Sequence, residues 1–80
     1  MTQGDFLQKF VSQFSETDPS TITIDTNFRE IDEWSSLTAL EIIAMVDEEY
    51  GVTLSGDDLR NSNKVSDIYD VIKSKMSGNV

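Results

Sequence analysis

Apolar residues recur at helical spacing in three separate stretches of this chain, and that periodicity constrains the fold more than any other feature. The stretch from Asp5 to Phe14 has apolar side chains at positions i, i+1, i+4, i+5 and i+8, which describe one face of a helix. A second periodic stretch runs from Ser36 to Tyr50, and a third from about Val65 to Lys75. This pattern predicts an all-α fold.

The second helix has the best-defined ends. Ser35 or Ser36 can cap its N-terminus, and Gly51 is a suitable residue just past its C-terminus. The pair Thr38 and Glu41 offers a further capping-box pattern. Its apolar face is expected to hold Leu37, Leu40, Ile43, Ala44, Val46 and Tyr50, widened by Ala39, Ile42 and Met45. Its polar side is expected to hold Glu41, Asp47, Glu48 and Glu49.

The remaining segments read as connections and one short helix. Residues Thr21–Asp25 alternate like a strand, but no second strand can pair with them, so we expect an extended loop. Gly56–Arg60 is expected to form a single helical turn, and Trp34 to anchor the loop on the bundle. The apolar stripe of the last helix is expected to hold Val65, Ile68, Tyr69, Ile72 and Met76. We therefore predict one domain, residues 1–80, with a small four-helix bundle of three longer helices, one short helix and a long first loop.

The charge of the chain limits the kinds of partner that it can bind. Fifteen Asp and Glu face six Lys and Arg, with no His, for a net charge of −9. No basic residue lies between Glu30 and Leu59, whereas nine acidic ones do. The resulting negative electrostatic field disfavours binding to nucleic acid and anionic membranes and favours binding to basic protein surfaces. With no cysteine, no signal peptide and no apolar run of about 18 residues, we expect a cytoplasmic protein, and the charge favours a monomer.

The chain contains no recognisable catalytic set. Without His or Cys there is no Ser–His or Cys–His pair, and no zinc, calcium or phosphate-loop motif occurs. What stands out is a pair of serines, Ser35 and Ser36, where a long loop meets a helix N-terminus. Unpaired backbone N–H groups and the helix dipole would stabilise a phosphate ester there. The local pattern alone, however, favours two serines that merely cap the helix.

From about Phe28 to Lys75 the sequence resembles the acyl carrier and peptidyl carrier proteins, and this resemblance favours a different role for the two serines. Those proteins begin their second helix with an Asp-Ser-Leu motif and end it with Glu-Glu, an aromatic residue and glycine. This chain has Ser35-Ser36-Leu37 at the first place and Glu48-Glu49-Tyr50-Gly51-Val52 at the second. The approach Phe28-Arg29-Glu30-Ile31, the segment from Leu54 to Leu59 and the run Val65-Ser66-Asp67-Ile68 also match.

The resemblance implies a carrier, not an enzyme. Ser36 matches the serine that receives 4′-phosphopantetheine from coenzyme A through a separate phosphopantetheinyl transferase, usually Mg²⁺-dependent. The thiol of this arm holds acyl groups as thioesters, which synthase or acyl-transferring enzymes with basic patches exchange. Partner docking is implied for Leu37, Glu41, Asp47 and Glu48. Candidates for lining an acyl pocket are Ala39, Ile43, Val46, Leu54 and Ile68.

One departure from the family pattern bears on function. Ser35 stands where the family nearly always has Asp. Serine keeps the helix-capping role, but a carboxylate beside the reacting hydroxyl is lost, and Asp32 or Glu33 would have to replace it. The alternative hypothesis is therefore an unmodified, carrier-like acidic module that binds a basic partner through its second helix. Only the carrier hypothesis needs Ser36.

Overall fold

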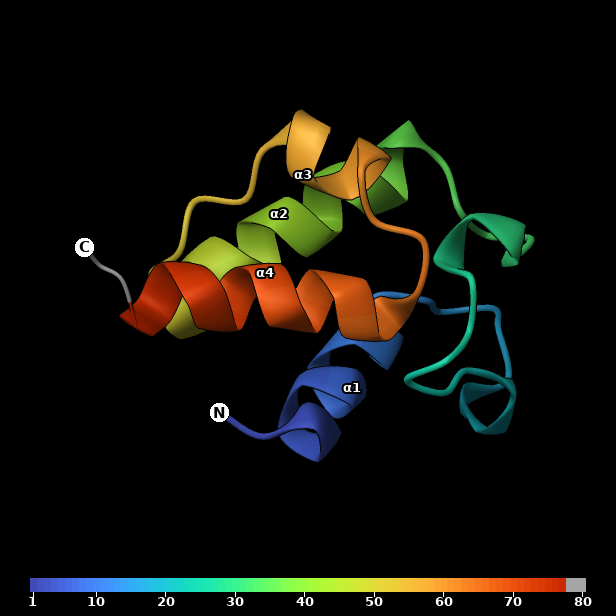
Figure 1. Cartoon of the computed structure of the whole chain (residues 1–80). Coiled ribbons are helices and arrows are strands. Elements are labelled where there is room, and N and C mark those ends of the chain that lie inside the picture. Colours follow the sequence, from blue (N-terminus) through green and yellow to red (C-terminus); the bar gives the residue numbers. More distant parts are fainter. Residues whose placement is uncertain (78–80) are drawn as a thin grey trace.

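The computed structural model describes residues 1–77, which form four α-helices and two short 3₁₀ helices (Figure 1). The α-helices are α1 (Gln3–Val11), α2 (Ser36–Tyr50), α3 (Gly56–Arg60) and α4 (Val65–Ser77). The 3₁₀ helices are η1 (Pro19–Thr21) and η2 (Phe28–Glu30), both in the long first loop. Among the described residues there is no β-strand, only an isolated bridge between Asn27 and Lys64. The predicted all-α fold with three longer helices and one short helix is confirmed.

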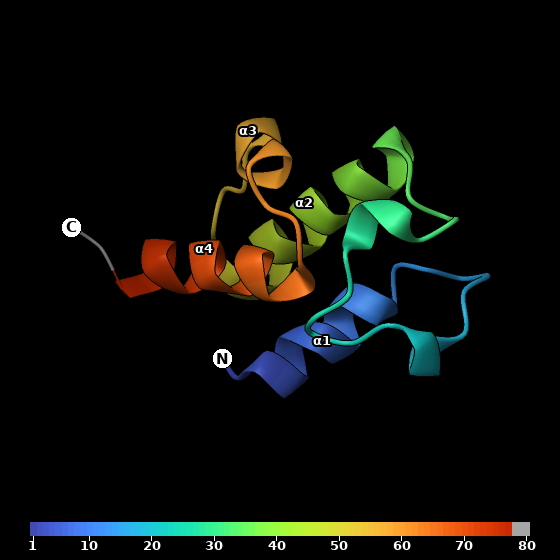
Figure 2. The same cartoon turned by 45° about the vertical axis from the view of Figure 1, so that its right-hand side comes forward.

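The helices gather around α4. Figures 1 and 2 show α1 on one side of α4 and α3 on the other, with α2 alongside. The long first loop, residues 12–35, lies at the end of the bundle where α2 begins, and both views agree on this. Within the described part of the chain, no helix has the length and apolar content that a membrane crossing requires.

The ends of α2 follow from local chemistry. The Ser35 hydroxyl oxygen accepts a hydrogen bond from the backbone N–H of Thr38, so Ser35 is the N-cap and Ser36 the first helical residue. At the other end, Gly51 has a φ of 66°, in the left-handed region that glycine adopts without strain. Its N–H donates to the Asp47 carbonyl, which closes the helix.

Aromatic side chains fill the centre of the core. Phe6, Phe10 and Phe28 are fully buried, and Phe14 is nearly so. Their rings form a chain of tilted and edge contacts, with centroids 5.9 Å apart for Phe6 and Phe10 and 5.2 Å apart for Phe10 and Phe14. The aliphatic side chains that complete the core are Ile22, Ile42, Val46, Val52, Leu54, Leu59, Val65, Ile68 and Ile72.

The first helix is shorter than its apolar pattern predicts. It begins at Gln3, where Thr2 caps it by accepting from the Asp5 N–H, and it ends at Val11. Beyond that point the backbone tightens, because the N–H of Phe14 donates to the carbonyl three residues earlier. Phe14 is still buried, which explains why the apolar pattern continues past the end of the helix.

Two expectations about apolar faces are wrong. Leu40 on α2 is 63% exposed and Ala44 is also exposed, whereas Ile42 and Met45 are in the core. Helix α2 is apolar on nearly every side, so its pattern cannot say which stripe faces inward. On α4, Met76 is 48% exposed because it lies in the last turn, beyond the last core residue Ile72.

The capping box predicted from Thr38 and Glu41 is also wrong. Thr38 lies inside α2 rather than before it, and its buried hydroxyl donates to the carbonyl of Glu33 at 2.8 Å. Thr38 therefore ties the first turn of the helix to the loop that precedes it.

Candidate functional site at the start of α2

The two adjacent serines at the start of α2 have different surroundings. The Ser35 hydroxyl is occupied: it accepts from the Thr38 N–H at 3.3 Å and lies 3.2 Å from the Thr38 hydroxyl. The Ser36 side chain is exposed, and among residues 1–77 its hydroxyl makes no hydrogen bond. The structure therefore separates a serine that caps the helix from a serine that is free for chemistry.

The loop that leads into α2 is anchored by Trp34. Its ring lies edge-on to Phe28 with centroids 4.7 Å apart and stacks against Phe14 at 6.4 Å. Its backbone N–H donates to the Ile31 carbonyl at 2.8 Å. Trp34 is half-buried, so the predicted anchoring role is confirmed. The anchor holds Ser36 at a fixed place on the surface.

A groove lies beside Ser36, between α2 and α3, with a volume of about 340 Å³. Its walls are largely apolar and come from η2, the loop before α2, α2 itself and α3. The lining residues are Phe28, Arg29, Trp34, Ser36, Ala39, Leu40, Ile43, Gly56, Leu59 and Arg60. A group attached to the Ser36 hydroxyl would begin at this groove.

The residues predicted to line an acyl pocket fall into two sets. Ala39 and Ile43 line the groove. Val46, Leu54 and Ile68 are instead packed in the core, with exposed fractions of 0, 2 and 0%. The structure thus brings the first two to the surface beside Ser36 and places the other three in the interior.

The residues predicted to dock partners share one exposed region of α2. Leu37, next to Ser36, is 67% exposed, and Leu40 one turn later is 63% exposed. Glu41, Asp47 and Glu48 are exposed on the same helix. An apolar surface beside Ser36 therefore shares α2 with exposed acidic residues.

The two carboxylates that could replace the missing Asp differ in availability. The Glu33 carboxylate accepts hydrogen bonds from the Thr17 hydroxyl at 2.5 Å and the Glu16 N–H at 2.9 Å. These bonds, the Thr17 hydroxyl first, lower the pKa of Glu33 and commit its carboxylate to the start of the long loop. Asp32 is exposed, and its carboxylate makes no hydrogen bond within residues 1–77. Of the two, only Asp32 has a free carboxylate.

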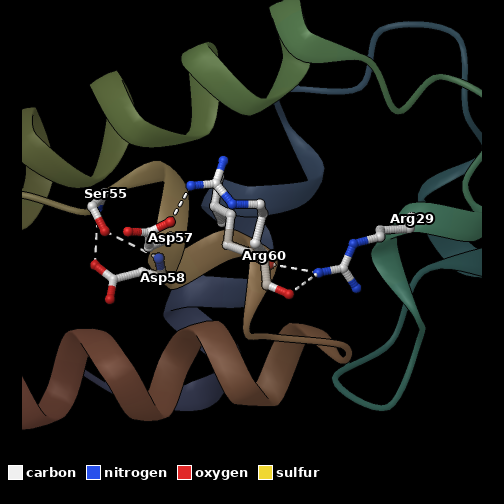
Figure 3. A network of polar contacts seen from close by, with 6 residues as sticks. Arg29, Ser55, Asp57, Asp58 and Arg60 are labelled. Atoms are coloured by element: carbon white, nitrogen blue, oxygen red, sulfur yellow. Dashed lines mark hydrogen bonds and ion pairs between the residues drawn. The ribbon is translucent and has the colours of Figure 1, made fainter.

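Sequence reasoning missed two arginines at the groove. Arg29 reaches across from η2 to the C-terminal end of α3, where its Nη2 donates to the carbonyls of Leu59 and Arg60, both at 2.7 Å. Arg60 pairs with Asp57 on α3, as Figure 3 shows. Their position in the sequence could have identified them, because Arg29 and Arg60 border the stretch that has no basic residue.

The described residues offer no other chemistry of comparable definition. Among residues 1–77, no cluster of acidic side chains is arranged to hold a metal ion. A second hollow, of about 480 Å³, lies between the first loop and η2 and is lined mostly by polar residues. Ser36 does not line it.

The chain is similar to known proteins over most of its length. Residues 5–72 match the family described as "Phosphopantetheine attachment site". The chain is 30% identical over 71 residues to an acyl carrier protein of Treponema pallidum (strain Nichols), covering 89% of this chain and 91% of that protein. It is 31% identical over 70 residues to "Polyketide-8 synthase acyl carrier protein 2" of Streptomyces avermitilis, covering 88% and 80%. It is 32% identical over 73 residues to an acyl carrier protein of Rickettsia rickettsii (strain Iowa), covering 88% and 85%.

Proposed function

Because the chain belongs to the phosphopantetheine-binding carrier family, whose members are carriers and not enzymes, we propose that it is a discrete acyl carrier protein with its covalent 4′-phosphopantetheine on Ser36. The observation that supports Ser36 most strongly is the contrast between the two serines. Ser35 is used as the helix cap, whereas the Ser36 hydroxyl is exposed and unbonded within the described residues.

The surroundings of Ser36 fit the group. The hydroxyl lies on the first residue of a fifteen-residue helix, where unpaired N–H groups and the positive end of the dipole favour a phosphate. The neighbouring groove offers apolar walls for a tethered chain. When bound, phosphopantetheine supplies a thiol, which this cysteine-free chain lacks.

Attachment would transfer phosphopantetheine from coenzyme A to the Ser36 hydroxyl. The Ser36 oxygen attacks the phosphorus of coenzyme A that carries pantetheine, and an ester bond forms between oxygen and phosphorus. The bond between the two phosphates of coenzyme A breaks, and adenosine 3′,5′-bisphosphate leaves. Within residues 1–77 the Ser36 hydroxyl has no hydrogen-bond acceptor, so we expect the separate transferase to take its proton.

We propose that the cargo is an acyl thioester of fatty acid or polyketide synthesis. One relative is named an acyl carrier protein of a polyketide synthase and another simply an acyl carrier protein, and the two are about equally similar to this chain. The proposed partners are a phosphopantetheinyl transferase and synthase or acyl-transferring enzymes with basic docking patches. Leu37 would supply an apolar contact and Glu41, Asp47 and Glu48 the complementary charge. The proposed location is the cytoplasm, where coenzyme A is supplied.

The test is the intact mass of the protein after incubation with coenzyme A, Mg²⁺ and a broad-specificity phosphopantetheinyl transferase. The parent chain should gain one phosphopantetheine, and Ser36→Ala should gain none. The matched control is Ser35→Asn, which removes the neighbouring hydroxyl but keeps a good N-cap, and it should still be loaded.

Two results would overturn the assignment. Loading of Ser36→Ala would move the attachment to another residue. Failure of the parent with several transferases would favour the unmodified module, whose binding to a basic partner should be the same for the parent and for Ser36→Ala.

A further inference from the structure

Arg60 is the cation at the α2–α3 groove whose guanidinium is not committed to the fold. Both Arg60 and Ser36 line the groove. Arg29, the other arginine there, donates to the carbonyls of Leu59 and Arg60 and to the side chain of Asn63, so three hydrogen bonds tie its guanidinium to the fold. Arg60 has a single partner in the described residues, Asp57.

The pair between Arg60 and Asp57 is easily exchanged. Both side chains are largely exposed, 73% and 75%, and they lie three residues apart on the same short helix. Such pairs are screened by solvent and add little to stability. An anion that offers the guanidinium a better set of acceptors can therefore displace Asp57 at little cost to the fold.

The guanidinium is already directed at the groove. Figure 3 shows it extending from α3 toward α2. Its Nη1 lies 3.6 Å from the place where a Cβ on Gly56 would stand, an ordinary van der Waals distance, so the guanidinium lies close to the first residue of α3. The apolar walls of the groove include Trp34, Leu40 and Leu59.

We propose that Arg60 exchanges Asp57 for the phosphodiester of the arm on Ser36 and thereby holds the arm along the α2–α3 groove. The inference rests on the proposed function. The phosphodiester is an anion that a guanidinium can bind with two hydrogen bonds. The dimethyl carbon that follows it along the arm is apolar, as are the walls of the groove. In a chain of net charge −9, an arginine held here only by an exposed ion pair offers the arm a local attraction that the acidic residues of α2 do not.

The position of the arm can be measured directly. The holo-protein is labelled at the arm thiol with a nitroxide, and paramagnetic broadening of the Leu40, Ile43 and Leu59 methyl signals is recorded. Quenching of Trp34, the one tryptophan of the chain, gives an independent reading from the groove wall. We expect broadening and quenching in the parent that fall at least twofold in Arg60→Gln and recover in part in Arg60→Lys.

Two further variants sharpen the test. Asp57→Asn removes the competing carboxylate, so broadening and quenching should increase. Lys64→Gln makes the same change of net charge outside the groove and should leave both readings at the parent values. Added salt should weaken the readings in the parent more than in Arg60→Gln.

The outcomes separate this inference from the proposed function. Intact mass shows first whether each variant carries the arm. If no variant and no parent protein is loaded, both the proposed function and this inference are wrong. If all variants are loaded but Arg60→Gln gives the same broadening and quenching as the parent, Arg60 does not hold the arm and the inference is wrong. Equal changes in Arg60→Gln and Lys64→Gln would attribute the effect to net charge alone and would also overturn it.

Discussion

At the scale of single residues, the decisive difference is between two neighbouring hydroxyls. Ser35 accepts from the Thr38 N–H and so gives its oxygen to the helix start. Ser36 is one residue later, at the first position of the helix, and its hydroxyl is exposed and does not serve as the cap. The helix cap therefore leaves the next residue chemically available without weakening the fold.

The replacement of the usual Asp by Ser35 has a testable cost. Ser35→Asp would keep the N-cap and restore a carboxylate beside the Ser36 hydroxyl, where a transferase with Mg²⁺ can use it. We expect the initial rate of loading by a generic transferase to rise several-fold, measured by intact mass over time. Ser35→Asn, which caps the helix without a charge, is the control. Equal rates for the parent and Ser35→Asp would mean that the departure has no consequence for that enzyme.

The same scale shows what a sequence pattern can and cannot identify. Ser36 was predicted from its place at a helix start and from the family motif. Arg29 was not, because its role depends on two carbonyls about thirty residues further along the chain. No local spacing encodes such a contact. The exposure of Leu40 was missed for a related reason, since α2 is apolar on several sides and only tertiary packing selects the inner one.

At the scale of the elements, α3 is a helix that its neighbours hold in place. Five residues are too few for a stable isolated helix. Ser55 and Asp58 form a capping box at its start. Lys75 of α4 donates to the Asp58 carboxylate at 2.8 Å, which is the main reason that the pKa of Asp58 is lowered. Arg29 completes its C-terminal end.

Removing the Arg29 tie should loosen α3. Arg29→Met deletes the donors to the Leu59 and Arg60 carbonyls, and we expect a loss of about 1 kcal/mol of unfolding free energy. Amide hydrogen exchange should rise in α3 more than in α1. Arg29→Lys keeps the charge but not the fork, so it should recover only part of the loss. Uniform exchange across all helices would contradict a local role for Arg29.

The start of α4 depends on an ionised carboxylate. The Asp67 carboxylate accepts from the N–H groups of Lys64 and Asn63, at 2.9 and 3.0 Å. These bonds, that of Lys64 first, lower the pKa of Asp67 below its ordinary value of 3.8. Its stabilising effect is therefore complete above that value and is lost as the pH falls through the lower folded value.

The lowered pKa of Asp67 predicts how the protein unfolds in acid. Asp67→Asn can still accept both hydrogen bonds but does not titrate, so its melting temperature should fall less than that of the parent as the pH drops below about 4. Circular dichroism melts between pH 7 and 2.5 measure this. The control is Asp70→Asn on the same helix, because the Asp70 carboxylate makes no hydrogen bond in residues 1–77. Parallel curves for Asp67→Asn and the parent would show that Asp67 contributes nothing to the acid sensitivity.

At the scale of the whole molecule, the sequence predicted the helices better than it predicted their assembly. Periodicity and caps located α2, α3 and α4 to within a few residues, because those signals are local. The groove beside Ser36 was not predicted, since its walls come from η2, α2 and α3 together. Of the residues predicted to line an acyl pocket, Val46, Leu54 and Ile68 lie in the core and Ala39 and Ile43 on the groove wall, a division set by tertiary packing that no local pattern encodes.

The net charge is also a property of the whole molecule, and together with the proposed docking surface on α2 it predicts how fast partners bind. With a net charge of −9 and the acidic residues Glu41, Asp47 and Glu48 exposed along α2, encounter with a basic enzyme surface should be fast and sensitive to salt. Glu48→Lys should raise the KM of the transferase for this protein several-fold while kcat stays within about twofold, because the charge acts on encounter and not on chemistry.

Asp70→Lys on α4 makes the same change of net charge away from α2 and is the matched control. If the field of the whole molecule were responsible, both variants would raise KM equally. If the surface of α2 is responsible, Glu48→Lys should have the larger effect, and the gap should narrow as salt rises toward 0.5 M, where the screening length is only a few Å. Equal KM values for the two variants at low salt would therefore reject α2 as the docking surface while leaving the attachment at Ser36 untouched.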